Sequence, residues 1–274
     1  MTHDSRLTTL IDTHTHLYEV QFDTDRTEMI ERAINAGVCK MIIPNVDSST
    51  IQPMLNLVEQ FPENIFPMMG LHPCYVKQET YKQELEIVRK YLFDDITLTT
   101  HDLRLTTTFV AVGEIGIDMH WDKSTLEIQK EAFELQCDWA IEKNLPVAIH
   151  ARESTHILIE ILKKRKQNPS GVFHCFTGSL EEANEIIKLG FYLGIGGVVT
   201  YKNTNLRDTL KHIPIDKIVF ETDSPYLPPV PYRGKRNESA YTKLVAETLC
   251  TVYEKGLDEI SAITTQNSHK LFGI

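Results

Sequence analysis

Two histidines, His14 and His16, follow the short apolar run Leu10-Ile11 near the start of the chain. On an extended strand, side chains two residues apart point to the same side, so both imidazoles can face one site. Neutral imidazole is a common ligand of zinc, manganese, iron and nickel. Taken alone, the pair indicates either a metal site or two hydrogen-bonding histidines.

A carboxylate, Glu114, lies in the apolar segment Val112-Gly113-Glu114-Ile115-Gly116. Such surroundings disfavour an unpaired charge, and the two glycines admit close approach of neighbouring backbone. A carboxylate that bridges metal ions fits this placement; the alternative is a structural carboxylate paired with an arginine. Asp118, four residues later, is either a partner of such a ligand or an ordinary loop residue.

Three further residues of ligand type come at the end of apolar runs: His150, His174 and Asp223. Either histidine, taken singly, could be a hydrogen-bonded residue of the core. Asp223 could ligate a metal and orient or deprotonate an attacking water. The joint pattern carries more weight than its parts, because independent structural roles would not place all these residues at strand ends.

The candidate metal ligands are His14, His16, Glu114, His150, His174 and Asp223. Two divalent cations about 3.5–4 Å apart would bridge one hydroxide and lower its pKa. Such a pair stabilises either an in-line displacement at phosphorus or attack on a carbonyl. The pattern therefore predicts a hydrolase with a binuclear metal centre.

The elements that must position these residues are short apolar runs separated by longer amphipathic segments. Most runs are continuous rather than alternating, as expected of parallel strands buried on both faces. The predicted strands are 10–11, 39–43, 65–69, 109–112, 146–149, 171–173, 191–195 and 217–220.

The segments between the runs have helical spacing of apolar residues and helix-start signals. Ser124 with Glu127, and Ser179 with Glu182, have the spacing of capping boxes. Gly190 is placed to end a helix in the left-handed conformation. The predicted helices are 25–36, 48–60, 124–143, 154–166, 179–189, 204–212 and 240–255.

Eight strand–helix units in alternation predict an α/β fold, a (β/α)₈ barrel of the TIM type, rather than a doubly wound sheet. Neither a dinucleotide-binding fingerprint nor a P-loop follows the first run. The simplest organisation is a single domain over residues 1–274, with a polar excursion at 94–108 before the fourth strand. Active sites of such barrels lie at the carboxyl ends of the strands, where all six candidate ligands fall.

The bulk composition limits the function classes. Hydrophobic residues make up 42% and charged residues 24%, ordinary for a globular protein. With neither a long apolar run nor a signal-like start, we expect a cytoplasmic protein that does not bind membranes. The five scattered cysteines predict neither a disulfide framework nor a cysteine zinc site. The net charge of −10 argues against a broad basic surface for nucleic acid, but not against a local grip on a few phosphates.

An ordered set of motifs resembles the TatD family of metal-dependent deoxyribonucleases, within the amidohydrolase-like superfamily. The resemblance runs from about residue 10 to the C-terminus. The motifs are DTHTH at 12–16, GLHP at 70–73, GEIGID at 113–118, HAR at 150–152, HCFTGS at 174–179, ETDSPYLPP at 221–229, PYRGKRNE at 231–238 and NSHKLFG at 267–273.

The resemblance implies that Glu114 bridges two metal sites. One would contain His14, His16, Glu114 and Asp223, and the other Glu114, His150 and His174. It also implies a nuclease, an activity usually associated with magnesium in the family. Histidine-rich ligation suits zinc, manganese or nickel as well, so the sequence leaves the identity of the two cations open among Mg, Zn, Mn and Ni.

Other polar residues are candidates for contact with substrate. His72 in GLHP could donate a hydrogen bond to a phosphoryl oxygen or act as a general acid, or else simply fix its loop. Arg152 and Arg233 could bind phosphate oxygens, a task that suits the guanidinium group. Lys235 and Arg236 could assist them or belong to a solvated loop. Three tyrosines could stack on bases or pack: Tyr201, Tyr226 and Tyr232.

The leading hypothesis is a phosphodiesterase that hydrolyses DNA, with 3′–5′ exonuclease action as one form, in which Asp223, Glu114 and His72 are catalytic. A first alternative keeps the metals but hydrolyses a small cyclic amide or lactone. Enzymes of that kind often bridge their metals with a carboxylated lysine, whereas here Glu114 takes the bridging position. A second alternative is a non-catalytic scaffold. The expected partner is the phosphodiester substrate, with no obligate protein partner.

Overall fold

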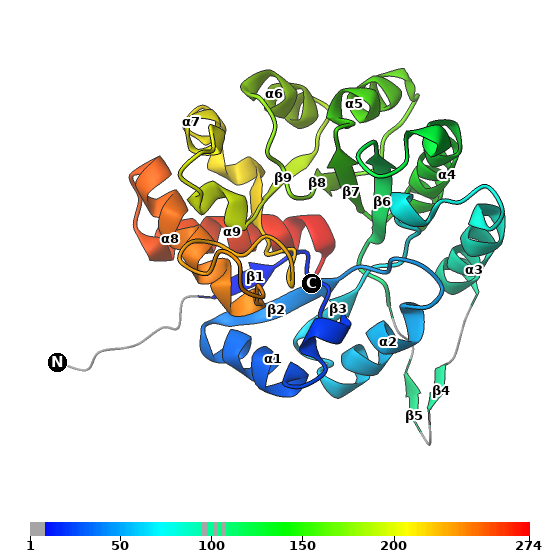
Figure 1. Ribbon diagram of the computed structural model, residues 1–274, viewed down its shortest axis with the longest axis horizontal. Coiled ribbons are helices and arrows are strands. Elements are labelled where there is room, and N and C mark those ends of the chain that lie inside the picture. The colour runs from blue at the N-terminus through cyan, green and yellow to red at the C-terminus, as the bar shows by residue number, and fades with distance from the viewer. Residues whose placement is uncertain (1–8, 95–97, 101–102, 106–107) are drawn as a thin grey trace.

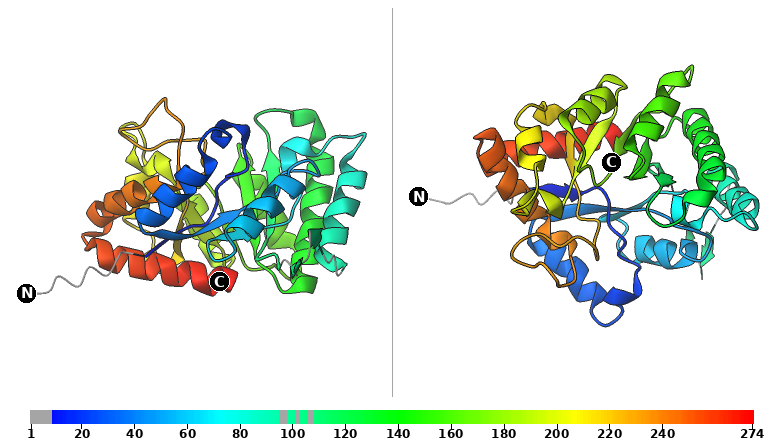
Figure 2. Two further views of the ribbon diagram at one scale, coloured as in Figure 1. Left: turned by 90° about the horizontal axis from the view of Figure 1, so that it is seen from below. Right: turned by 45° about the horizontal axis from the view of Figure 1, so that its top comes forward.

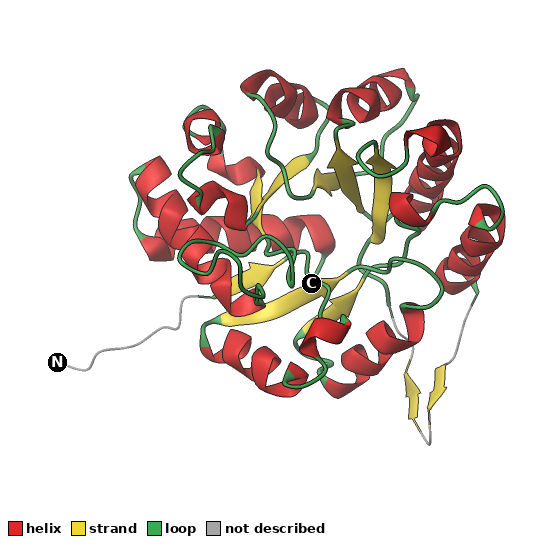
Figure 3. Cartoon of the chain, viewed as in Figure 1, coloured by secondary structure: helices red, strands yellow, loops and turns green. Residues whose placement is uncertain are grey.

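The computed structural model describes residues 9–94, 98–100, 103–105 and 108–274. Its centre is a ring of parallel strands with helices around the outside (Figure 1; Figure 3). The strands form two parallel sheets, with orders β1-β2-β3 and β10-β9-β8-β7-β6. Their bounds are β1 (Leu10–Asp12), β2 (Val38–Ile43), β3 (Ile65–Pro67), β6 (Val112–Asp118), β7 (Val147–Arg152), β8 (Gly171–Phe173), β9 (Tyr192–Ile195) and β10 (Ile218–Phe220).

Backbone contacts join the two sheets at both of their facing edges. Met68 and Ala111 form a parallel bridge between the β3 and β6 segments. On the other side, the N–H of Thr13, just after β1, donates to the carbonyl of Phe220 at the end of β10, at 2.9 Å. The parallel strands of the described residues are thus arranged as a (β/α)₈-type barrel, which confirms the predicted fold class.

Helices follow the strands and cover the outside of the ring. Two of them, α3 and α9, were not predicted. The observed helices at the predicted positions begin later or end earlier than the predicted ranges. The bounds in the described part are α1 (Arg26–Asn35), α2 (Ile51–Gln60), α3 (Tyr81–Phe93), α4 (Leu126–Lys143), α5 (Thr155–Lys164), α6 (Leu180–Lys188), α7 (Leu206–Leu210), α8 (Thr242–Tyr253) and α9 (Leu257–Phe272).

Only one of the two predicted capping boxes forms. At the start of α6, the Ser179 hydroxyl accepts from the N–H of Glu182, and the Glu182 carboxylate accepts from the N–H of Ser179. The box predicted for Ser124 and Glu127 is wrong. Asp122 accepts from both the N–H and the hydroxyl of Ser124, which starts a 3₁₀ turn and delays the start of α4. A nearer carboxylate therefore takes the position that the serine was expected to fill.

Alternate residues of the strands fill the interior of the barrel. The interior cluster contains Ile42, Met68, Val110, Ala111, Ala148, Val172, Tyr192, Val219, Leu271 and Phe272. Side-chain direction repeats every two residues along a strand. The residues that come two positions after Ala148, Val172 and Val219 are His150, His174 and Glu221, so each continues the inward-facing row beyond the apolar layer.

Helix α9 closes the end of the barrel opposite those residues (Figure 2). The Asn267 side chain donates to the carbonyl of Ile215, in the 3₁₀ turn before β10, and to that of Ile218, the first residue of β10. Leu271 and Phe272 of the same helix join the interior cluster. The C-terminal motif NSHKLFG therefore seals the bottom of the barrel and lies away from the candidate site.

The excursion predicted at 94–108 contains a short antiparallel pair of strands, β4 (Leu98–Thr100) and β5 (Leu103–Leu105). The remainder, at 95–97, 101–102 and 106–107, lies outside the described residues. The single domain over 1–274 stays a prediction.

In the described part, no helix combines the length and the apolar character that crossing a membrane requires. All five cysteines carry free thiols.

One glycine is required where β6 and β7 lie side by side. Gly116 has φ +149°, and a Cβ built there would lie 2.0 Å from the carbonyl oxygen of its neighbour His150.

We expect Gly116→Ala to lower the free energy of unfolding by about 3 kcal/mol, because both backbone strain and overpacking oppose the substitution. Urea denaturation measures the change. The control Gly256→Ala, where a Cβ meets nothing within 4 Å, should change stability by less than about 1 kcal/mol; equal effects would contradict the argument.

Candidate metal centre

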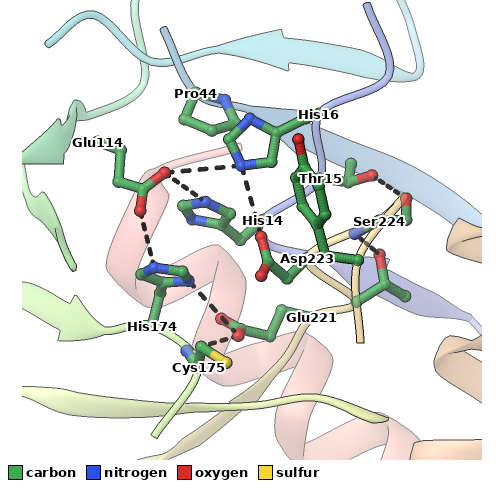
Figure 4. Close-up of polar contacts among 12 residues, drawn as sticks. His14, Thr15, His16, Pro44, Glu114, His174, Cys175, Glu221, Asp223 and Ser224 are labelled. Carbon is green, nitrogen blue, oxygen red and sulfur yellow. Dashed lines mark hydrogen bonds and ion pairs between the residues drawn. The ribbon is translucent and has the colours of Figure 1, made fainter. Parts of the chain in front are cut away.

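The candidate ligands converge on Glu114, a carboxylate that is only 1% exposed (Figure 4). Its Oε2 lies 3.0 Å from Nε2 of His14 and 3.6 Å from Nε2 of His16. Its Oε1 lies 2.8 Å from Nδ1 of His150 and 2.8 Å from Nε2 of His174. Residues from β6, β7 and the segments after β1 and β8 thus meet around one carboxyl group.

Asp223 joins the same cluster through His16, whose Nε2 lies 3.4 Å from Oδ1 of Asp223. The backbone of Asp223 is left-handed, with φ +56°. This conformation is unfavourable for a residue with a side chain, and hydrogen bonds hold it in place. The N–H of Asp223 donates to the carbonyl of His14 at 2.9 Å, which ties the segment after β10 to the segment after β1. All six predicted ligands therefore lie together.

The protonated nitrogen of His16 is fixed by a tyrosine. The Tyr18 hydroxyl donates to the carbonyl of Pro44 at 2.7 Å, so its oxygen accepts from Nδ1–H of His16 at 3.0 Å. Nε2 of His16 then carries the lone pair, and this nitrogen faces Glu114 and Asp223. A hydrogen bond of this kind sets both the tautomer and the orientation of a ligating histidine.

Asp118 fixes His150 in the same way. Its Oδ2 lies 2.9 Å from Nε2 of His150, and a carboxylate can only accept, so Nε2 carries a proton. Nδ1, with its lone pair, then faces Glu114. Burial alone would raise the pKa of Asp118, but the hydrogen bonds from His150 and from the N–H groups of Trp121 and His120 hold it well below its usual range. Of the two roles considered for Asp118, the structure favours that of a partner to His150.

Glu221 lies behind His174, with Oε1 3.7 Å from Nδ1 of the imidazole. The same oxygen accepts from the N–H of Cys175 at 2.6 Å. Gly194 leaves the space for this carboxylate, since a Cβ there would lie 2.2 Å from Oε2 of Glu221. Nδ1 of His174 thus lies beside the buried Glu221, while Nε2 of the same ring faces Glu114.

The charges of the cluster depend on one another. Burial alone would raise the pKa of Glu114, but the surrounding histidines hold it well below its usual range. Burial lowers the pKa of His14. Burial would lower the pKa of His174 too, yet Glu114 and Glu221 outweigh it and raise that pKa well above its usual value. Glu114 is therefore ionised at neutral pH, which is the form that binds a cation.

The donor atoms fit divalent cations. Three groups have donor atoms within 4.8 Å of one another: His14, His16 and Glu114; His72, Glu114 and His150; and His14, His174 and Asp223. All six predicted ligands belong to at least one of these groups, and the first two groups share Glu114. In the neutral form of the rings, the nitrogens of His16 and His150 that face Glu114 carry lone pairs and have no proton to share with it, so a cation that replaces the shared proton is a favourable arrangement.

His72, predicted as a substrate contact, lies next to Glu114, with its Nε2 3.2 Å from Oε1 of the carboxylate. Its Nδ1 accepts from the N–H of Cys74 at 3.1 Å, so the proton of the neutral ring is on Nε2. Burial lowers the pKa of His72, which favours the neutral form. A nitrogen that carries a proton can donate but cannot ligate a metal. The tautomer thus separates His72 from the other histidines and suits a hydrogen-bond donor.

The two predicted phosphate-binding arginines are both exposed and both lie over aromatic rings. The guanidinium carbon of Arg152 is 5.4 Å from the Trp121 ring centre, and that of Arg233 is 3.8 Å from the Tyr201 ring centre. Their contact with phosphate stays a prediction. Arg236 has a structural role instead, because its guanidinium binds the Asp25 carboxylate at 2.6 and 2.8 Å.

The three tyrosines considered for base stacking have different surroundings. Tyr232 stacks on Tyr241 with ring centres 4.2 Å apart, which corrects its predicted role to one in packing. The Tyr201 ring is covered by Arg233, and its hydroxyl donates to the carbonyl of Pro228. Tyr226 remains 45% exposed, beside the His16 ring.

Sequence reasoning missed two residues that orient the ligands, Tyr18 and Glu221. A signal was present for both in the alternation of two. Tyr18 comes two residues after His16, and Glu221 comes two residues before Asp223, on the inward-facing row of β10. Neither residue type, however, indicates which histidine it serves.

We expect Asp118→Asn to weaken divalent-cation binding by about tenfold, because a neutral amide makes the His150 ring a poorer donor. The measurement is calorimetric titration of Mn²⁺ into chelator-treated protein. The melting temperature without metal should stay near that of the wild type. Asp208→Asn on α7, an exposed carboxylate paired with Lys211, is the matched control. Unchanged Mn²⁺ affinity in Asp118→Asn would remove Asp118 from the metal centre.

Comparison with known proteins places the chain in a family. It matches the family described as TatD related DNase over residues 11–273. It is 41% identical to the metal-dependent hydrolase YabD of Bacillus subtilis (strain 168), over 97% of this chain and 99% of that protein. It resembles the crystal structure of YjjV, a TatD homologue from Escherichia coli K12, with TM-score 0.86 and 30% identity over 97% of this chain and 98% of that one. A TatD family hydrolase from Entamoeba histolytica shares the fold, with TM-score 0.80 and 22% identity over 96% and 98%. The motifs and the fold thus lead to the same assignment: the chain is a metal-dependent hydrolase of the TatD family.

Proposed function

We propose that this hydrolase cleaves phosphodiester bonds, with DNA as its substrate, and that 3′–5′ exonuclease action is one form of the activity. The observation that carries the proposal is the arrangement around Glu114. In the neutral rings, lone pairs of His16 and His150 face this carboxylate, whereas Nε2 of His72, which carries the proton of its neutral ring, faces the same space. The site therefore combines cation binding with hydrogen-bond donation.

Two divalent cations at this centre would supply charge stabilisation and an activated water at neutral pH. Glu114 would be shared between them, with His14, His16 and Asp223 on one side and His150 and His174 on the other. Burial alone would raise the pKa of Asp223, but His16 and the other histidines lower it, so that its carboxylate is ionised and can accept a proton from the attacking water.

The remaining groups suit a phosphate ester. Nε2–H of His72 can donate to a phosphoryl oxygen and neutralise developing charge there. Arg152 and Arg233 offer exposed guanidinium groups for the phosphates of a longer substrate. Because the chain has a net charge of −10, binding of a nucleic acid would depend on these local cations rather than on a broad basic surface. We also propose that the protein acts in the cytoplasm.

The arrangement favours this reading over a small cyclic amide or lactone as substrate. A metal bridge made by a carboxylated lysine needs a lysine at the centre, and none is among the buried polar residues of the described part. Glu114 supplies a carboxylate at the centre of the cluster and could take the bridging role instead. A non-catalytic scaffold would have no use for the hydrogen bonds that fix the tautomers of His16, His150 and His72.

The first test is hydrolysis. Chelator-treated protein reloaded with Mg²⁺, Mn²⁺, Zn²⁺ or Ni²⁺ should cleave bis(p-nitrophenyl) phosphate and single-stranded DNA. Glu114→Gln should lower kcat by at least about 10²-fold, because the carboxylate serves both cations. Glu247→Gln, exposed on α8, is the control. Turnover of lactones or dihydropyrimidines alone would overturn the proposal, as would full activity of Glu114→Gln.

A second test separates donation from ligation at His72. We expect His72→Ala to lower kcat for the phosphodiester by about 10²-fold, the usual contribution of a positioned proton donor. Affinity for Mn²⁺ should stay within about threefold of wild type, because Nε2 of His72 carries a proton and does not ligate. Calorimetry measures the second quantity. A loss of Mn²⁺ affinity comparable to that of Glu114→Gln would make His72 a ligand and contradict its assigned tautomer.

A further inference from the structure

Trp121 is the most exposed aromatic side chain among the large hydrophobic residues of the described part, at 70%. It lies on the loop that follows β6, the strand that carries Glu114. The only other tryptophan of the chain, Trp139, is 6% exposed and packs in the core. The His120 ring meets the indole edge to face, with ring centres 5.0 Å apart, and most of the indole remains open to solvent, where a ligand can reach it.

The loop is joined to the metal centre through a single carboxylate. Oδ1 of Asp118 accepts from the N–H of Trp121 at 3.1 Å and from that of His120 at 2.9 Å. Oδ2 of the same residue binds His150 at 2.9 Å. The backbone of Trp121 therefore has a fixed position relative to the cluster around Glu114, although its ring is open to solvent.

A cation accompanies the ring. The guanidinium of Arg152, two residues after His150, lies 5.4 Å from the indole centre. The neighbouring Glu153 is bound by His120 at 2.9 Å and approached by Lys123 at 3.8 Å. Arg152 has no ion-pair partner among the carboxylates of the described residues, so its charge remains available to a ligand.

We propose that Trp121 and Arg152 form a nucleobase subsite, in which the base next to the scissile phosphate stacks on the indole face while Arg152 contributes to the same stack. This inference rests on the proposed function and specifies how the substrate is held. A nucleobase fits better than an apolar partner, because the guanidinium of Arg152 lies over the indole and can join a stack on a base. Every base has a π-face, so the subsite would tolerate sequence while requiring an accessible base.

The kinetic test uses two diesters with one leaving group. Thymidine 5′-p-nitrophenyl phosphate carries a base, and methyl p-nitrophenyl phosphate does not. We expect Trp121→Ala to raise KM for the thymidine ester about tenfold, as stacking on an aromatic ring usually contributes. KM for the methyl ester, and kcat for both, should change less than about twofold. Trp121→Phe should restore most of the loss, and Leu135→Ala, an exposed apolar residue on α4, should behave as wild type.

A binding test does not depend on turnover. Thymidine 5′-monophosphate and deoxyribose 5-phosphate differ only in the base. Titration of metal-loaded wild type with the nucleotide should quench tryptophan fluorescence, and Trp121→Phe should abolish that quenching. Deoxyribose 5-phosphate should leave the fluorescence unchanged. The difference between the two proteins isolates the signal of Trp121 from that of the buried Trp139.

The outcomes separate the two proposals. Equal effects of Trp121→Ala on both esters, or no effect on either, would overturn the nucleobase subsite while leaving phosphodiester hydrolysis intact. Equal quenching by the nucleotide and by deoxyribose 5-phosphate would also overturn it. If the wild type hydrolyses neither ester with any cation, the proposed function fails, and the fluorescence titration still decides whether Trp121 binds a base.

Discussion

The burial of one ionised carboxylate constrains the whole upper face of the barrel. Glu114 is fully withdrawn from solvent and holds its negative charge only because imidazoles surround it. Taking a carboxylate out of water is costly unless it is paired or binds a metal. The groups that compensate it come from separate strands, so the barrel must bring the strand ends together before the charge can be tolerated. The same closure of the barrel that completes the fold therefore also assembles the cluster around Glu114.

The ligands need partners of their own, and these partners decide what each histidine can do. Tyr18 and Asp118 leave a lone pair on the nitrogen of His16 and of His150 that faces Glu114. Cys74 does the reverse at His72 and leaves a proton there. Chemically identical side chains thus acquire different functions from one hydrogen bond each. The same Asp118 also accepts a hydrogen bond from the N–H of Trp121, so one carboxylate joins the cluster around Glu114 to the loop after β6.

The two ends of the barrel differ in composition: the bottom is apolar, and the top contains the ionisable cluster. At the bottom, α9 supplies Leu271 and Phe272 to the interior and covers the amino ends of the strands. At the top, the inward-facing row changes from apolar to ionisable after a single layer. The chain as a whole is acidic, and two of its exposed arginines, Arg152 and Arg233, each lie over an aromatic ring.

The sequence by itself indicated most of the strands, most of the helices and all six candidate ligands, because hydrophobic periodicity and the alternation of two are local properties. The fourth strand, expected at 109–112, instead spans Val112–Asp118 as β6 and contains Glu114. It also placed His72 and the arginines near the mouth of the barrel. Only the tertiary structure decided that Asp122 rather than Ser124 begins the turn before α4, that Arg236 binds Asp25, and which nitrogen of each histidine carries its proton. Those outcomes depend on which distant groups come within hydrogen-bond distance, and no local pattern encodes that distance.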